Sequence, residues 1–283
     1  MIKNLIELTK VRIGFLVLMT TIIGFYLGSN GSIVYDLLVF TIAGTLMSST
    51  GASVLNNFLE IDNDSKMERT KHRVLPTKKI SRTYALLLGV ILIISGLSIL
   101  YLKVNLITTI LSFVTITLYL FIYTPLKQIS WLNTSVGAIP GAIPPLGGWT
   151  AATGQVELGG IALFLILFFW QHPHFYSIAF MHKDDYEKGG FKMLPSINGG
   201  VKRTVVHIFL HALILIPVST LPFFFGVSGR LYLVGAYFLS NVYMLLCLPF
   251  ILEQSHKNAD LIFKTSIFYF PLLLSLIVAD LRV

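Results

Sequence analysis

The stretch IVYDLLVFTIAGTLMSSTGASVLNNFLEIDNDSKMERTKHR, residues 33–73, decides the fold. Its first part, residues 33–58, holds one charged residue, Asp36, and is longer than the roughly 20 residues that a helix needs to cross a bilayer. The remainder is dense in acids and bases. A long apolar run that ends in a charged segment is typical of a membrane-spanning helix and its loop.

The composition of the whole chain agrees with this interpretation. Of 283 residues, 55% are hydrophobic and 12% are charged, whereas soluble domains carry about 25% charged residues. So little charge excludes a water-soluble protein, and a single cysteine, Cys247, excludes a disulfide scaffold. A net charge of +8 would favour nucleic acid in a soluble protein, but in a membrane protein it is typical of loops facing anionic lipid. We therefore expect a lipid bilayer and no nucleic acid as partner.

Nine stretches are apolar enough to span a membrane. We predict an all-α, polytopic membrane protein with nine transmembrane helices, and a single domain over residues 1–283. The stretches are 13–28, 33–58, 83–102, 105–124, 134–152, 159–180, 204–226, 231–252 and 262–280.

The basic residues predict the orientation. With nine spans, 18 of the 21 Lys and Arg lie on the side of the N-terminus, and loops rich in these residues stay in the cytoplasm. We expect a cytoplasmic N-terminus and an external C-terminus. The first span is too long for a removable signal peptide, and no Arg/Ser-rich transit segment precedes it. A bacterial plasma (inner) membrane is the simplest location.

Seven of the thirteen acids lie in two segments, 60–68 and 184–187, which both follow a span on the predicted cytoplasmic side. In the first segment, Asn56, Glu60 and Asp64 share one helical face at spacings of four, with Asn57 beside them and Asp62 opposite. Stacked carboxylates repel one another and attract a cation. Oxygen ligands of this kind suit Mg²⁺, which usually takes one or two carboxylates and substrate phosphate oxygens.

Bases follow the first acids directly, and the guanidinium groups of Arg69 and Arg73 fit phosphate oxygens. Acids for a metal beside bases for phosphate predict a diphosphate site. The simpler alternative is a solvated, charged helix end. The repetition of acid beside base at 183–186 (KDDY) favours the site.

Several motifs resemble one known family. The run NNFLEIDNDSKMERTKHRVL, residues 56–75, resembles the first acidic signature of the UbiA superfamily of intramembrane prenyltransferases, with Asn57 and Glu60 where that signature has Asp. Its tail is similar to the extension found in the haem-farnesylating branch, although Val74 replaces proline. The second acidic signature is incomplete, since Lys188 and Gly189 follow Asp184 and Asp185 by four residues. Further similar stretches are LTKVRI (8–13), YTPLK (123–127), GAIPGAIPPLGGWTAATG (137–154), WQHPHF (170–175) and KDDYEKGGFKMLP (183–195).

The resemblance implies a UbiA-type helix bundle around a central cavity. It also implies a reaction. The farnesyl group of farnesyl diphosphate would pass to a vinyl group of haem B, giving haem O, after Mg²⁺-assisted ionisation of the diphosphate on the cytoplasmic side. It leaves open self-association or contact with haem A synthase. The implied catalytic residues are Asn57, Glu60, Asp64, Asp184 and Asp185; the metal ligands are Asn56, Glu60, Asp64 and Asp185; the diphosphate contacts are Arg69, Arg73, Lys127 and Lys183.

Some interior residues permit two interpretations. His174 lies on the helical face of Asp185, so it is a candidate haem ligand, or else a buried structural histidine, as we expect for His207 and His211. Residues 140–148 hold three prolines and three glycines, which predicts a broken helix lining the cavity or, alternatively, tight helix packing. Aromatic faces that could stabilise a cation are those of Tyr119, Tyr123 and Trp149.

Two other functions compete with haem farnesylation. A prenyltransferase acting on an aromatic quinone precursor is disfavoured by the incomplete second acidic signature. A transporter would carry its acids near the bilayer midplane in repeated halves, whereas here they crowd one membrane face beside Arg and Lys.

Overall fold

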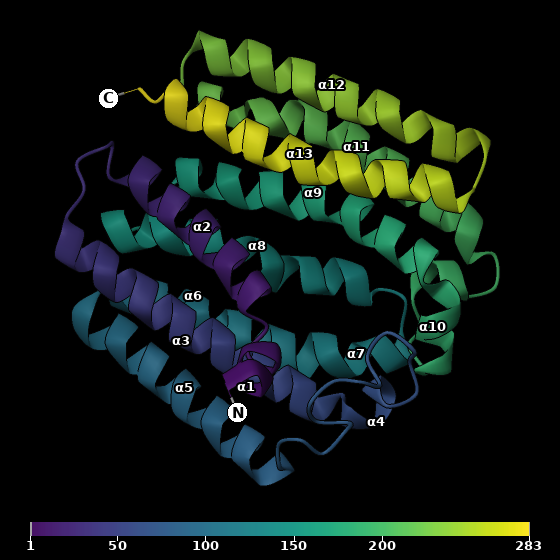
Figure 1. The fold of residues 1–283 in the computed structure, drawn as a ribbon. Coiled ribbons are helices and arrows are strands. Elements are labelled where there is room, and N and C mark those ends of the chain that lie inside the picture. The colour runs from purple at the N-terminus through teal and green to yellow at the C-terminus, as the bar shows by residue number, and fades with distance from the viewer. Residues whose placement is uncertain (1, 283) are drawn as a thin grey trace.

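The computed structural model describes residues 2–282, which form helices and no β-strand (Figure 1). The helices are α1 Ile2–Leu8, α2 Val11–Gly28, α3 Tyr35–Leu59, α4 Ile61–Asp64, α5 Arg82–Lys103, α6 Leu106–Thr117, the π-helix η1 Leu118–Tyr123, α7 Thr124–Ile129, α8 Asn133–Thr153, α9 Leu158–Met181, α10 Lys183–Lys188, the 3-10 turn η2 Leu194–Ser196, α11 Gly200–Phe224, α12 Arg230–Leu252 and α13 His256–Ala279.

The nine predicted spans all coincide with long helices, the fourth being the continuous α6–η1–α7. Eight helices of residues 2–282 are long and apolar enough to cross a membrane. The ninth long helix, α8, is not among these eight, because glycines and prolines take the place of larger apolar residues along it. The prediction of an all-α, multi-pass membrane protein is confirmed.

The long helices form three groups (Figure 1). In one, α11 and α13 pack on α9 and α12 packs on α11 and α13, and in another α3, α5 and α6 lie together on the opposite side. Between them α2 packs along α8, and α8 packs on α9. The short helices α4, α7 and α10 and the loop after α4 gather at one end of the bundle. The two acidic segments of the sequence therefore meet at the same end.

Two glycines allow α2 and α8 to touch backbone to backbone. A Cβ atom on Gly24 would lie 1.9 Å from the carbonyl oxygen of Pro145, and one on Gly148 would lie 1.9 Å from that of Thr21. No side chain fits at either position. This close contact fixes α8 as an inner wall of the bundle.

The prediction of a broken helix at residues 140–148 is wrong, because α8 runs without interruption from Asn133 to Thr153. Each proline removes one backbone N–H, and in a membrane bundle neighbouring groups can satisfy the freed carbonyl oxygen. Pro140, Pro144 and Gly147 nevertheless line the cavity described below, as predicted for this stretch.

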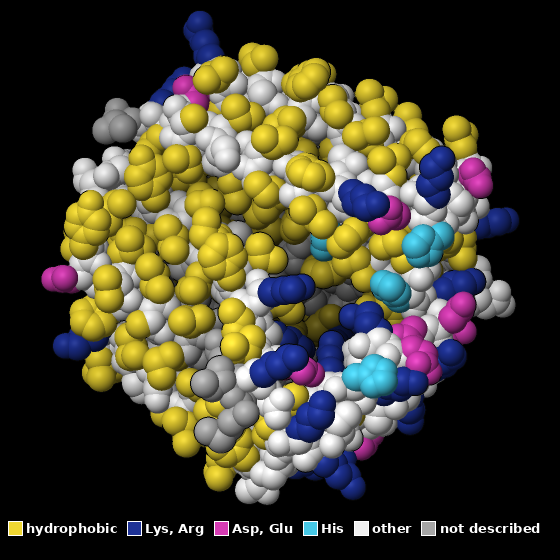
Figure 2. Space-filling view, viewed as in Figure 1, with side chains coloured by type: hydrophobic (Ala, Val, Ile, Leu, Met, Phe, Trp, Pro, Cys, Tyr) yellow, Lys and Arg dark blue, Asp and Glu magenta, His cyan; other side chains and the backbone are white. Residues whose placement is uncertain are grey.

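The surface has two kinds of region (Figure 2). Apolar side chains cover most of the visible face, as expected where lipid is the solvent. Over the whole molecule, Phe121 and Phe268 are among the large apolar side chains that are exposed. Lys and Arg side chains gather toward the end that carries α4 and α10, and the face is hollowed near its centre beside them.

Candidate functional site

The predicted stack of Asn56, Glu60 and Asp64 is present at the end of α3. Although α3 ends at Leu59, the spacing of four continues, because the Glu60 amide donates to the Asn56 carbonyl (3.0 Å) and the Asp64 amide donates to the Glu60 carbonyl (2.8 Å). Asp62 points to the opposite side, as predicted, where its exposed carboxylate lies 3.3 Å from Arg82. One face of this helix end therefore carries the buried polar groups.

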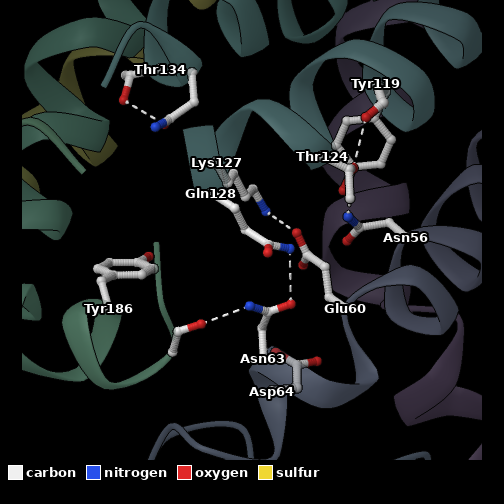
Figure 3. Close-up of polar contacts among 12 residues, drawn as sticks. Asn56, Glu60, Asn63, Asp64, Tyr119, Thr124, Lys127, Gln128, Thr134 and Tyr186 are labelled. Atoms are coloured by element: carbon white, nitrogen blue, oxygen red, sulfur yellow. Dashed lines mark hydrogen bonds and ion pairs between the residues drawn. The ribbon is translucent and has the colours of Figure 1, made fainter. Parts of the chain in front are cut away.

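Both buried carboxylates of this stack face a cation. Glu60 is 4% exposed, and its Oε1 lies 2.7 Å from Lys127 Nζ (Figure 3). Asp64 is 1% exposed, and its Oδ2 lies 2.7 Å from Arg73 Nη1. A buried charge without a partner costs several kcal/mol, so each carboxylate lies beside a cation that can compensate its charge inside the protein. Arg73 and Lys127, predicted as diphosphate contacts, are brought to the acids.

A local feature of the fourth span directs Lys127 toward Glu60. Pro125, at the start of α7, has no N–H to donate to the preceding turn, and that turn, residues 118–123, is a π-helix. The Thr124 hydroxyl donates to the Tyr119 carbonyl (2.8 Å) and accepts from Asn56 Nδ2 (3.0 Å). Such π-turns are frequent at functional sites, and this one fixes α7 against the end of α3.

The two asparagines of the stack differ in their hydrogen bonding. Asn56 Oδ1 accepts from Lys10 Nζ (2.9 Å), and burial, followed by the neighbouring Arg73 charge, lowers the pKa of Lys10 to about 7. Asn57 Nδ2 donates to the Leu8 carbonyl (2.9 Å), but its Oδ1 is buried without a donor. A buried oxygen without a hydrogen-bond donor destabilises the protein by about 1–3 kcal/mol. A ligand that contacts this oxygen would remove that cost, so Asn57 Oδ1 is a candidate ligand atom.

These groups suit a divalent cation whose remaining ligands come from the substrate. No three His, Cys, Asp or Glu side chains of residues 2–282 come together around one point. The helix end instead offers the carboxylates of Glu60 and Asp64 and the free amide oxygen of Asn57. Mg²⁺ usually binds through one or two carboxylates plus phosphate oxygens. The donor set suits a Mg²⁺–diphosphate pair better than a metal held by protein alone.

Asn63 connects the first acidic segment to the second. Its Nδ2 donates to the Gly189 carbonyl just after α10 (2.7 Å), and its Oδ1 accepts from Gln128 Nε2 of α7 (3.1 Å) (Figure 3). The sequence prediction missed both Asn63 and Gln128. Only the position of Asn63 between two acids could have drawn attention to it.

Asp185 lies where the two segments meet. Its oxygens accept hydrogen bonds from the backbone amides of Glu68 (2.7 Å) and Arg69 (3.3 Å), so it holds the loop that follows α4. Arg69 also reaches Tyr186, with Nη2 3.4 Å from the hydroxyl and the guanidinium 5.6 Å from the ring centre. The prediction that the two segments share a site is consistent with these contacts.

The other predicted residues of α10 lie farther out. Asp184 is exposed and Lys183 is half-buried, and neither side chain makes a hydrogen bond or ion pair to another described residue. The structure does not bring either of them to Glu60 or Asp64.

A cavity of about 510 Å³ extends from the loop residue Arg69 into the bundle. Tyr119 and Tyr123 line it with stacked rings, 5.6 Å between centres, and Lys127 Nζ lies 4.6 Å from the Tyr123 ring centre. Such a volume is in the range of small-molecule sites. A charged end beside an apolar interior suits a ligand with an anionic head and an apolar body. Other lining residues include Ile13, Val17, Ser48, Leu111, Ile116, Pro140, Gln171, Phe175 and Met193.

His174 and Trp149 lie outside this cavity lining. His174 Nδ1 lies 2.7 Å from the Ser266 hydroxyl of α13, and the ring stacks on Trp170. Trp149 Nε1 donates to Glu157 (2.8 Å) at the far end of α8. The face of α9 that does reach the cavity carries Gln171, three residues earlier.

His207 and His211 pack between α9 and α11, where His211 stacks on His172 with 3.8 Å between ring centres. This packing is consistent with the structural role expected for the pair, which stays a prediction. Two residues that do belong to the site, Lys10 and Tyr186, were used in the sequence prediction only for orientation and similarity. Both residues lie inside stretches that resemble the UbiA superfamily. Their position in those motifs was therefore the feature of the sequence that could have identified them as site residues.

Comparisons with known proteins agree with this geometry. Residues 17–272 match the UbiA prenyltransferase family. The chain is 42% identical to the protoheme IX farnesyltransferase of Solibacter usitatus (strain Ellin6076), over 98% of each protein.

Two solved structures show the same fold. One, of digeranylgeranylglyceryl phosphate synthase, is 18% identical with a TM-score of 0.81 and covers 99% of this chain and 98% of that one. The other is a UbiA homolog from Archaeoglobus fulgidus bound to GPP and Mg²⁺, 15% identical with a TM-score of 0.67, covering 97% of this chain and 99% of that one.

Proposed function

The chain belongs to the UbiA prenyltransferase family, and we propose that it transfers the farnesyl group of farnesyl diphosphate to a vinyl group of haem B, giving haem O. The observation that carries this proposal is the pair of buried carboxylates, Glu60 and Asp64, each held by a cation, with Lys127 lying against the Tyr123 ring that lines the apolar cavity. The similarity to a protoheme IX farnesyltransferase over nearly the whole length supports haem as the acceptor. We treat residues 1–283 as one transmembrane prenyltransferase domain.

The helix end of α3 would hold Mg²⁺ through Glu60, Asp64 and the amide oxygens of Asn56 and Asn57. Asp185 can join them, because each of its oxygens keeps a second lone pair besides the one that accepts a backbone N–H. When bound, the metal neutralises the charge that develops on the leaving diphosphate.

The bases of the site would hold the diphosphate. Arg73 and Lys127 are within reach of the acids, and Arg69 extends from the loop to the cavity. We assign Lys183, together with Asp184, to the outer rim of the same site on α10. Guanidinium groups bind phosphate oxygens in pairs, so the diphosphate leaves with its charge compensated.

The cavity would hold the apolar groups. The rings of Tyr119 and Tyr123 form part of its wall next to Lys127, where their faces can stabilise the allylic cation. The orientation, with the site and the N-terminus toward the cytoplasm of a bacterial inner membrane, belongs to the proposal. Haem contact by His174, self-association and contact with haem A synthase stay predictions.

A direct assay tests this function. Purified protein in detergent receives farnesyl diphosphate, haem B and Mg²⁺, with an aromatic acid as a competing acceptor, and products are identified by mass spectrometry. We expect farnesylated haem, no prenylated acid, and loss of product after chelation of the metal. Prenylation of the aromatic acid alone would instead support a quinone-precursor prenyltransferase. Absence of any prenylated product, together with solute flux in vesicles, would support a transporter.

A further inference from the structure

Gln171 is a polar residue on the cavity wall that the proposed metal and diphosphate contacts do not use. It lies inside the span α9, lines the cavity, and is 4% exposed. A buried amide within a membrane bundle is costly unless its polar atoms are used. The hydrogen-bond partners of the two amide atoms therefore indicate the role of the Gln171 side chain.

The orientation of the Gln171 amide is fixed by its surroundings. One terminal atom lies 3.0 Å from the Leu167 carbonyl and 3.4 Å from the Ala138 carbonyl. Because both neighbours only accept hydrogen bonds, this atom must be the nitrogen Nε2. The oxygen Oε1 consequently points the other way.

Oε1 lies against Gly141 on the cavity wall. A Cβ atom on Gly141 would come within 2.2 Å of Oε1, and both residues line the cavity. No hydrogen bond to Oε1 comes from any side chain or amide among residues 2–282. A nearly buried acceptor is thus held in place at the cavity with no donor from the protein.

The depth of this acceptor follows from two glycines one turn apart on α8. A Cβ atom on Gly137 would lie 2.5 Å from the Tyr123 ring, and Gly141 contacts Gln171 in the same way. One helical turn is about 5.4 Å. Gln171 Oε1 is therefore about one turn deeper than the ring that lies beside Lys127, next to the place where the proposed allylic cation would form.

An oxygen acceptor requires a ligand with an O–H or N–H group. Neither the farnesyl chain nor a haem vinyl group has one. Water does, and the proposed reaction consumes one water molecule to form the hydroxyl group of haem O. We propose that Gln171 positions this water, an inference that rests on the proposed function.

The step balances as follows. The C1–O bond of farnesyl diphosphate breaks and its electron pair leaves with the diphosphate. The vinyl π electrons form the new bond from the terminal vinyl carbon to C1, which leaves a cation on the inner vinyl carbon. Water held by Oε1 adds its oxygen to that carbon, and its proton passes to the released diphosphate. Without a positioned water, the same cation loses a proton from the neighbouring carbon and gives an alkene lighter by one water.

Product ratios test this role. Gln171→Met keeps the size of the side chain and removes the acceptor, so we expect the ratio of hydroxylated to dehydrated farnesyl haem to fall at least tenfold while diphosphate is still released. Gln171→Asn withdraws the acceptor by one methylene and should give an intermediate ratio; it also serves if Gln171→Met does not fold. The matched control is Gln254→Met, since Gln254 Nε2 likewise donates to two helix carbonyls, those of Phe250 and Ile251, but lies away from the cavity.

An unchanged ratio in folded Gln171→Met or Gln171→Asn, whatever their rates, would overturn the proposal, because a merely structural side chain alters rate and stability without altering the ratio. Failure of the unmodified protein to make any farnesylated haem would overturn the proposed function as well, so the two failures can be told apart.

Discussion

The ends of α3 and α9 carry similar charge patterns but place them differently. At the end of α3, the carboxylates of Glu60 and Asp64 are buried, and each faces a cation 2.7 Å away. At the end of α9, Asp184 is exposed, and Asp185 holds two backbone amides of the loop after α4. Both helix ends lie at one end of the bundle (Figure 1).

This difference indicates that the two helix ends have different roles. Burying a pair of opposite charges costs desolvation energy. A binding site explains that cost, because the same carboxylates and bases can release one another and bind a charged ligand. A carboxylate that accepts backbone N–H bonds orders a loop at little cost. We infer that the α3 end supplies the main ligands of the metal and diphosphate, and that Asp185 of α10 mainly holds the loop after α4 in place and adds a weaker ligand.

The largest effect is expected from Asp64→Asn, which removes a metal ligand and the partner of Arg73. We expect farnesyl transfer to fall about 10³-fold, as for groups that stabilise transition-state charge, with the protein still folded. The control is Asp62→Asn, on the exposed side of the same turn, which should retain activity. Equal activity of the two variants would contradict the functional role assigned to the buried face of the α3 end.

Lys127→Met comes next. It should lower the rate about 100-fold through loss of a phosphate contact and also lower the melting temperature, because Glu60 would stay buried without its cation at a cost of about 3–5 kcal/mol. Thermal unfolding in detergent beside Lys188→Met, an exposed lysine of α10, measures the second effect. An unaltered melting temperature would mean that the Glu60 carboxylate does not depend on Lys127.

A smaller effect is expected from Asp185→Asn. An amide keeps only one oxygen for the two backbone donors of the loop, so we expect about a tenfold loss, the size found for residues that orient ligands, mainly as a raised KM for farnesyl diphosphate. Faster amide hydrogen exchange at Glu68 and Arg69 should accompany it. Glu187→Gln, exposed on the same helix, should alter neither quantity. A loss as large as that of Asp64→Asn would make Asp185 an equal member of the metal site.

Asn63→Ala should have the smallest effect of the four. It removes the hydrogen bonds to Gly189 and Gln128 that link the two helix ends. At about 0.5 kcal/mol for each of the two hydrogen bonds, the lower end of the usual range, the total is about 1 kcal/mol, so we expect roughly a fivefold decrease in activity. When Asn63→Ala is added to Lys127→Met, we expect a further decrease of much less than fivefold. A full additive loss in the double variant would show that the two residues act independently.

Much of the fold could be predicted from sequence, because membrane spans are long and locally encoded. All nine stretches correspond to long helices, and the spacing of four in Asn56, Glu60 and Asp64 was enough to predict one buried face. The exception was α8. Proline density predicted a break there, but the neighbouring helices, through contacts such as Gly24 on Pro145, keep it continuous.

The site was harder to predict, because its pairings join residues distant in the chain. Lys127 reaches Glu60 from 67 positions away, and Asn63 reaches Gly189 from 126 positions away. No local pattern encodes such contacts. The rotation of α9 also decides that Gln171 faces the cavity while His174 faces α13, which is a difference of less than one turn.

Metal binding tests the central claim most directly, namely that Glu60 and Asp64 exchange their internal cations for a metal that binds together with diphosphate. Mn²⁺ can stand in for Mg²⁺ and be followed by electron paramagnetic resonance in the purified protein, with and without farnesyl diphosphate. We predict weak binding of the metal alone, at least tenfold tighter binding with farnesyl diphosphate, and loss of the tight binding in Asp64→Asn. Tight binding that is the same with and without farnesyl diphosphate, or that persists in Asp64→Asn, would contradict the account.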